Sequence, residues 1–152
     1  MSNGKDLRYI IPIFGAVLAV ISIFTPAITI PGVGGQISVW IFGIKLDDND
    51  LIDISGGFIL GGTILMLFAY IGVALTIRGS LNLKKGEFEG AKLKLFLLIG
   101  GLLIIISSIF FMVQVITASS LEIYLDYIDF GFTVWGLLLA GAIIIVSIVL
   151  TL

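Results

Sequence analysis

Long uncharged apolar runs alternate with short polar segments along the chain. The runs are Tyr9–Ile30, Ile54–Ile77, Leu95–Leu121 and Phe130–Leu152, and none contains an Asp, Glu, Lys or Arg residue. An α-helix needs about 20 apolar residues to cross the hydrocarbon of a bilayer, and each run reaches that length. The pattern therefore predicts an all-α membrane protein in which four transmembrane helices form one bundle, a single domain over residues 1–152.

The polar segments that separate these runs differ in length and character. An outer segment is expected over residues 31–53, an inner loop over 78–94 and a second outer loop over 122–129. In the outer segment, Ile37, Val39 and Ile41 recur at every second position, which is the period of a strand with one covered face. We expect a short β-strand or hairpin in this extracellular segment, lying over the outer ends of the helices.

The apolar residues of this outer segment are candidates for an interaction surface. Tryptophan is favoured at the headgroup level of a membrane, and Trp40 stands in the middle of the apolar stretch. A strand at that level lies where a partner outside the cell can reach it. The residues expected to contact such a partner are Val39, Trp40, Ile41 and Phe42.

The basic residues indicate how the bundle is oriented. Seven of the eight lysines and arginines precede the first run or lie between the second and third runs, which four spans place on one side of the membrane. Seven of the ten acidic residues lie on the other side. Because cytoplasmic loops carry an excess of Lys and Arg, we expect a multi-pass protein of the cell membrane with both termini in the cytoplasm.

Composition excludes several classes of function. With 59% hydrophobic and 12% charged residues, the chain has more apolar surface than a soluble domain of this size can bury. It has no histidine and no cysteine, so the commonest general base and the thiol nucleophile are missing. The runs hold no ionisable Asp, Glu, Lys or Arg that would mark a proton relay or a transport path. We expect a protein that is not an enzyme, needs no cofactor and, at a net charge of −2, binds no nucleic acid.

An acidic cluster between the first two runs is a weak candidate for a metal site. Carboxylate oxygens suit hard cations such as calcium and magnesium. The candidate ligands are Asp48, Asp50 and Asp53. The cluster lacks the glycine and the glutamate that an EF-hand loop has at its sixth and twelfth positions, and solvation on the outer side of the membrane is the simpler explanation.

Small residues recur at four-residue spacing in three of the runs. Such residues let helices approach closely in lipid, where apolar contact alone gives no driving force. The residues expected to pack helices are Gly15, Ala19, Gly57, Gly61, Gly136 and Ala140. Packing within the bundle and docking on a second copy or a partner helix both stay open. Gln114, an amide within the third run, is expected either to bond a neighbouring helix or to contact a pore or a lipid.

The plan of the chain resembles the claudin-like tetraspan superfamily, which includes claudins and peripheral myelin protein 22. The shared features are inner termini, a larger first outer segment with β-character and a tryptophan, a short second outer segment and a short inner loop. Trp40, in VWIFG, is similar to the tryptophan of the claudin Gly-Leu-Trp motif, while the two cysteines that follow it in claudins have no counterpart here. The chain is also similar to small four-span proteins of bacteria and archaea.

These observations favour a non-enzymatic structural or interaction protein that packs laterally or self-associates in the membrane and presents a strand-containing cap. Its expected partners are membrane lipids and either further copies of itself, in a homo-oligomer, or a larger membrane protein complex. The alternative is an accessory subunit of a respiratory, transport or secretion complex. An oligomeric channel or a lipid-handling protein is a third hypothesis, which the uncharged spans make less favourable.

Overall fold

A computed structural model describes residues 3–32, 35–41, 44–47, 50–53, 56–85, 90–117 and 129–150 of the chain. Most of these residues are helical. The helices are α1 (Asn3–Ile23), α2 (Gly56–Lys85), α3 (Ala91–Thr117) and α4 (Phe132–Leu150). Helices α2, α3 and α4 are long and apolar enough to cross a membrane, whereas the apolar part of α1, Arg8–Ile23, is shorter.

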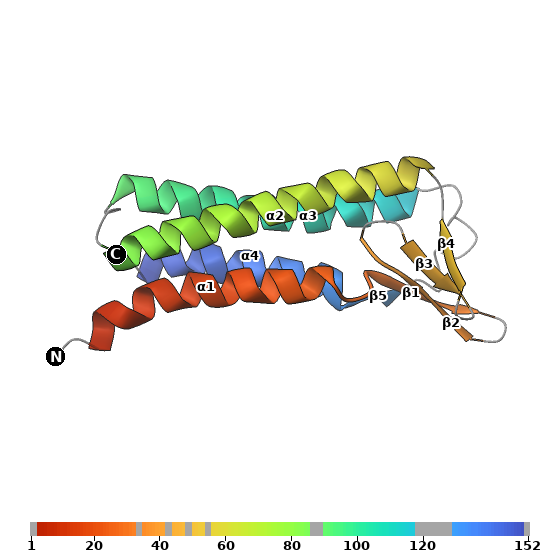
Figure 1. Ribbon diagram of the computed structural model, residues 1–152, viewed down its shortest axis with the longest axis horizontal. Helices are drawn as coiled ribbons and strands as arrows, with labels where there is room; N and C mark the ends of the chain where they lie inside the picture. Colours follow the sequence, from red (N-terminus) through yellow and green to blue (C-terminus); the bar gives the residue numbers. More distant parts are fainter. Residues whose placement is uncertain are drawn as a thin grey trace.

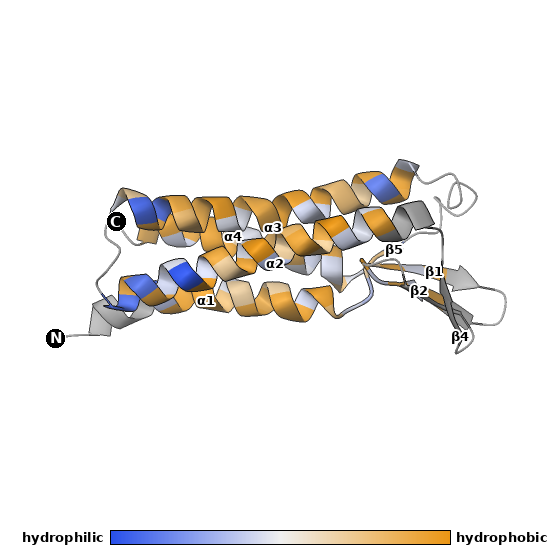
Figure 2. Ribbon diagram, turned by 45° about the horizontal axis from the view of Figure 1, so that its top comes forward, coloured by the Kyte–Doolittle hydropathy of each residue, from blue (hydrophilic) through white to orange (hydrophobic). Residues whose placement is uncertain are grey.

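The four helices form a bundle in which each packs against two neighbours. Helix α1 contacts α2 and α4, and α3 contacts the same two helices. Both chain ends lie at one end of the bundle, and a β-sheet lies at the other (Figure 1). Most hydrophilic residues of the helices gather at the end remote from the sheet (Figure 2). We call the two ends the sheet end and the basic end, the latter marked by Arg8, Arg78, Lys84, Lys85, Lys92 and Lys94.

The first apolar run does not form one helix from Tyr9 to Ile30, because α1 ends at Ile23. Two backbone N–H groups beyond Ile23 donate to carbonyls three residues back, which closes the last turn. Pro26 follows and has no N–H with which to continue the helix. The last apolar residues of the run instead enter strand β1 (Ile28–Gly32).

The inner loop expected over residues 78–94 is mostly helical. Helix α2 continues eight residues beyond Ile77, to Lys85, and α3 begins at Ala91. No proline interrupts this extension, and Leu83 within it packs against the buried core. The first lysine or arginine after an apolar run therefore marks the end of the uncharged apolar part of the helix and not the end of the helix itself. Residues 118–128, with most of the expected second outer loop, lie outside the described part of the chain.

The sheet is larger than the single strand or hairpin that the sequence predicts. Its strands are β1 (Ile28–Gly32), β2 (Gly35–Val39), β3 (Ile44–Asp47), β4 (Asp50–Asp53) and β5 (Asp129–Phe130). They lie in the order β4-β3-β2-β1-β5, and every neighbouring pair is antiparallel. Strand β1 thus pairs on one side with β2 and on the other with the short segment that leads into α4.

Large apolar side chains fill the inside of the bundle and also cover its outside. Leu97, Ile104, Phe111 and Ile144 are fully buried between the helices. On the outer surface the helices expose further large apolar side chains, among them Phe14, which is 61% exposed. This arrangement is stable where the surrounding solvent is the acyl chains of a bilayer, because lipid is as apolar as the side chains that face it.

Candidate functional site

The predicted outer interaction surface lies at the sheet end, but half of it faces inward. Val39 is 1% exposed and Ile41 is fully buried, so these two residues belong to the core. Alternation along the strand explains this, because the covered face of β2 is turned toward the ends of the helices. Trp40 is half-buried, and its indole Nε1 donates to the backbone carbonyl of Phe24 at 3.2 Å. Phe42 lies outside the described residues.

The weak metal candidates are not brought together by anything that the structure describes. Asp50 and Asp53 are the first and last residues of β4, and their side chains lie outside the described set, as does the whole of Asp48. Within the described side chains, no group of three potential metal ligands is found. The prediction of a metal site at the acidic cluster therefore falls outside the described side chains.

The small residues predicted to pack helices lie mainly where α1 meets α4. A Cβ atom on Gly15 would lie 2.7 Å from Cγ1 of Ile144 and 3.0 Å from the carbonyl oxygen of Ala140. Ala19 and Ala140 are fully buried. On α4, Gly136 lies against the hydroxyl of Ser22, with no room for a Cβ atom between them. Gly57 is the one member whose surroundings the structure does not describe.

Two further glycine pairs, formed between helices, hold the bundle together along α3. A Cβ on Gly72 of α2 would lie 2.6 Å from the carbonyl oxygen of Gly100, and a Cβ on Gly100 would lie 2.8 Å from that of Gly72. On the opposite side of α3, Gly101 and Gly141 approach each other in the same reciprocal way, at 3.0 and 2.8 Å. The adjacent glycines of α3 thus face different neighbours. The sequence alone does not show these pairings, because the rotation of each helix about its axis decides which glycines meet.

A hydroxyl cluster joins the end of α1 to the start of α4 at the sheet end. The hydroxyl of Thr133, in the first turn of α4, donates to the carbonyl of Ser22 at 2.8 Å and also lies against the carbonyl of Thr25. The Thr25 hydroxyl donates to the Ser22 carbonyl at 2.7 Å and lies 3.1 Å from Oγ1 of Thr133. The Ser22 carbonyl, which also accepts the backbone N–H of Thr25, thus receives two hydroxyl donors at the end of α1.

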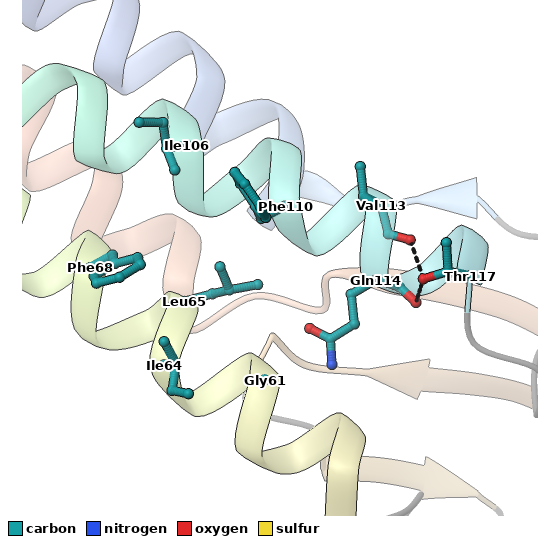
Figure 3. Close-up of a pocket in the computed structure, with 9 residues that line it drawn as sticks. All are labelled: Gly61, Ile64, Leu65, Phe68, Ile106, Phe110, Val113, Gln114 and Thr117. Atoms are coloured by element: carbon teal, nitrogen blue, oxygen red, sulfur yellow. Dashed lines mark hydrogen bonds between the residues drawn. The ribbon is translucent and has the colours of Figure 1, made fainter.

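An open apolar groove lies between α2 and α3, in the half of the bundle nearer the sheet (Figure 3). Its volume is about 480 Å³. The lining residues recur at helical spacing on both helices: Gly61, Ile64, Leu65 and Phe68 on α2, and Ile106, Phe110, Val113, Gln114 and Thr117 on α3. Most of them are exposed on the outer surface, and Phe110 is 59% exposed. The groove therefore opens sideways, toward the space that lipid occupies in a membrane.

Gln114 and Gly61 give the groove its polar end. The Gln114 side chain extends from α3 toward Gly61 on α2 (Figure 3). A Cβ on Gly61 would lie 2.6 Å from Nε2 of that amide, so the missing side chain makes the space that the amide occupies. Thr117, one turn further on, turns its hydroxyl back to the carbonyl of Val113 at 2.8 Å. The sequence marked both Gly61 and Gln114 but did not indicate that they face each other.

No family model, curated protein or solved structure matches the chain. The resemblance to claudin-like tetraspan proteins therefore stays a prediction from the plan of the sequence.

Proposed function

We propose that the chain is a four-span structural and interaction protein of the cell membrane, with both termini in the cytoplasm. It self-associates laterally through the α2–α3 groove and carries the five-stranded sheet as a cap on the outer side. The groove is the observation that supports this proposal. Here apolar side chains of α2 and α3 form a concave site rather than a simple lipid-facing stripe.

The direction in which the groove opens favours lateral docking over a path through the bundle. Phe111 and Ile104 on α3 and Ile144 on α4 are fully buried and fill the space between the helices. A packed interior leaves the outer wall as the place where a partner is received. This packing favours a structural or interaction role over a path that runs through the interior of a single bundle.

A second copy of the chain fits this face because the face carries both a hollow and a projection. Gly61 lies at the hollow, and Phe110 projects from the rim. A two-fold interface brings the same patch of both subunits together, so each projecting ring enters the groove of the other copy. Aromatic side chains placed in a well-packed pocket are also the residues that carry most of the energy of an interface.

Cysteine cross-linking in native membranes tests self-association, since the natural chain has no cysteine. Val113→Cys lies in the groove, and Val17→Cys lies on α1; the two valines are 49% and 48% exposed. We expect a short bifunctional maleimide to give a covalent dimer with Val113→Cys and none with the matched control.

Each other outcome of this experiment is also informative. Equal dimer yields at both positions would show random collision and contradict docking through the groove. No dimer at Val113→Cys, together with stoichiometric co-purification of other membrane subunits in mild detergent, would replace self-association by the role of accessory subunit.

The orientation is tested separately with single cysteines at the two ends. Lys85, the last residue of α2, and Asp129, in β5, are both exposed. In intact cells we expect a membrane-impermeant maleimide to label Asp129→Cys at once and Lys85→Cys only after permeabilisation. Labelling of both from outside would contradict the proposed topology.

A further inference from the structure

We propose that the basic end of the α2–α3 pair binds the headgroup of an anionic phospholipid, with Arg78 as the residue that contacts its phosphate. This site is separate from the groove, which lies nearer the sheet, and it does not depend on self-association. It requires only that α2 and α3 cross a membrane, for which both are long and apolar enough.

The positions of the cations along the two helices set their depth in the membrane. The uncharged part of α2, from Gly56 to Ile77, is roughly 33 Å long at 1.5 Å per residue. That length is close to the ~30 Å hydrocarbon thickness of a bilayer. Arg78 follows directly, and on α3 Lys94 directly precedes the uncharged stretch that begins at Leu95. Both cations therefore stand where hydrocarbon gives way to phosphate.

Contacts between α2 and α3 hold the guanidinium of Arg78 in place. Its Cζ lies over the ring of Phe96, 5.9 Å from the ring centroid. Gly79 brings the helices close here, since a Cβ on it would lie 3.1 Å from Cβ of Phe96. A guanidinium that lies over a ring uses its face for the ring, and its N–H groups point outward in the plane. That edge is the part of arginine that matches two phosphate oxygens.

The surroundings of Arg78 suit a lipid better than a free anion. Ile77 is 37% exposed, Leu81 is 45% exposed and Leu95 is 53% exposed, and all three are close to the cations in sequence. These side chains offer apolar contact to the acyl chains of the same molecule whose phosphate meets Arg78. Lys85 and Lys92 are exposed and add positive charge further toward water. Taking 1.5 Å of rise per residue, Lys85 lies about 10 Å beyond Arg78 and Lys92 about 3 Å beyond Lys94.

Of the other charged groups at this end, Lys84 makes a different contact, Arg8 is exposed, and the acidic side chains lie outside the described set. Lys84 reaches across to α1, where its Nζ lies 5.2 Å from the centroid of the Tyr9 ring. Arg8 is exposed on α1. The carboxylates of Asp6, Glu87 and Glu89 are close in sequence, but their side chains are not among those described. Arg8 thus offers a matched arginine at the same end of the bundle without a described ring partner.

Lipid retention measured on the full chain tests the site. The protein is released from nanodiscs that contain phosphatidylglycerol and phosphatidylcholine with identical acyl chains, and bound lipid is counted by native mass spectrometry. The variants are Arg78→Gln, its control Arg8→Gln, Arg78→Lys and Phe96→Leu.

We expect the natural chain to retain phosphatidylglycerol in preference to phosphatidylcholine. Arg78→Gln should weaken retention about tenfold or more, because it removes charge-assisted hydrogen bonds to the phosphate. Arg8→Gln should weaken it by roughly fivefold at most, the general effect of one cation near an anionic surface. Arg78→Lys and Phe96→Leu should give intermediate losses, since each keeps the charge and removes the paired geometry.

Three results would overturn the proposal. The first is equal retention of the two lipids by the natural chain. The second is an equal loss of phosphatidylglycerol retention in Arg78→Gln and Arg8→Gln when the two variants have the same melting temperature in detergent. That result would show that only the general positive charge of this surface matters. The third concerns competitors added to the lipid-bound protein. If inorganic phosphate, glycerol phosphate and a dioleoyl phospholipid all displaced the bound lipid at the same concentration, the site would recognise an anion and not a lipid.

Discussion

The two antiparallel helix pairs of the bundle are closed in different ways. At the sheet end, α1 and α4 stop short of α2 and α3, and the sheet occupies the space beyond them (Figure 1). There the hydroxyl of Thr133 and the strand pairing of β1 with β5 bind α1 to α4. Between α2 and α3, the same end of the bundle carries an open groove instead. One pair is sealed by hydrogen bonds and a sheet, and the other is left open to the membrane.

Glycines of the apolar helices therefore have two distinct uses in this chain. Gly72 lets backbone meet backbone at the middle of α2 and α3, and it closes the contact. Gly61, eleven residues earlier on the same helix, gives its space to a flexible amide and leaves the surface hollow. The sequence shows two glycines in similar apolar surroundings, and only the atoms that face them separate a packing contact from an open groove.

The largest effect is expected from Gly72→Ala, which breaks the closed contact. The new Cβ would lie 2.6 Å from the carbonyl oxygen of Gly100, and backbone cannot move aside as a side chain tip does. We expect a loss of about 1–3 kcal/mol in the free energy of unfolding, the range of overpacking. Thermal or dodecyl sulfate unfolding in detergent, followed by circular dichroism, measures it.

The same substitution at Gly61 is the matched control. Its Cβ would meet the end of the Gln114 side chain, which can turn away. Replacement of a helical glycine by alanine gains about 1 kcal/mol in helix propensity, which offsets that adjustment. We expect a change below about 1 kcal/mol, and equal losses at the two glycines would contradict the distinction drawn between them.

A smaller effect is expected from Thr133→Val, which removes the hydroxyl that joins α4 to the end of α1. The carbonyl of Ser22 then loses a buried donor, and hydrogen bonds in membrane proteins contribute about 0.6–2 kcal/mol each. We expect a loss of about 1–2 kcal/mol for this buried contact, together with faster hydrogen exchange of the β1 amides.

Thr117→Val is the matched control for the hydroxyl cluster. Thr117 is exposed, and its hydroxyl donates only to carbonyls of its own helix, α3. Its loss should change the unfolding free energy by a few tenths of a kcal/mol, as is usual for surface substitutions. If both threonine variants lost the same amount, the cluster would have no special role in closing the sheet end.

The membrane-like character of the helices could be predicted from the sequence, because uncharged runs of this length have few other stable environments. The position at which the first helix ends could not be predicted in this way. Ile28 and Ile30 are as apolar as the residues of a span, and they are buried in the fold as strand residues. Hydropathy measures the preference of a side chain for an apolar environment. A helix in lipid and a strand buried in the fold both provide such an environment, so hydropathy does not distinguish them.

The candidate site was predictable in its parts and not in its arrangement. Gly61 and Gln114 both stand out in the sequence, one as a small residue and the other as an amide in an apolar run. Their facing positions depend on how far α2 and α3 are rotated about their axes, which no local pattern records. Val39 and Ile41 failed as surface residues for a related reason, because alternation predicts two faces but does not say which is covered.

The order of the strands has a consequence for how the protein is made. Thr29 pairs with Asp129, so one edge of β1 has no neighbour in the sheet until the segment just before α4 has left the ribosome. A strand edge that waits beside a membrane is open to wrong pairing and to recognition by quality-control proteases. Synthesis arrested before α4 therefore yields an incomplete sheet with an unpaired edge, and the arrival of that helix both completes the bundle and ends the exposure.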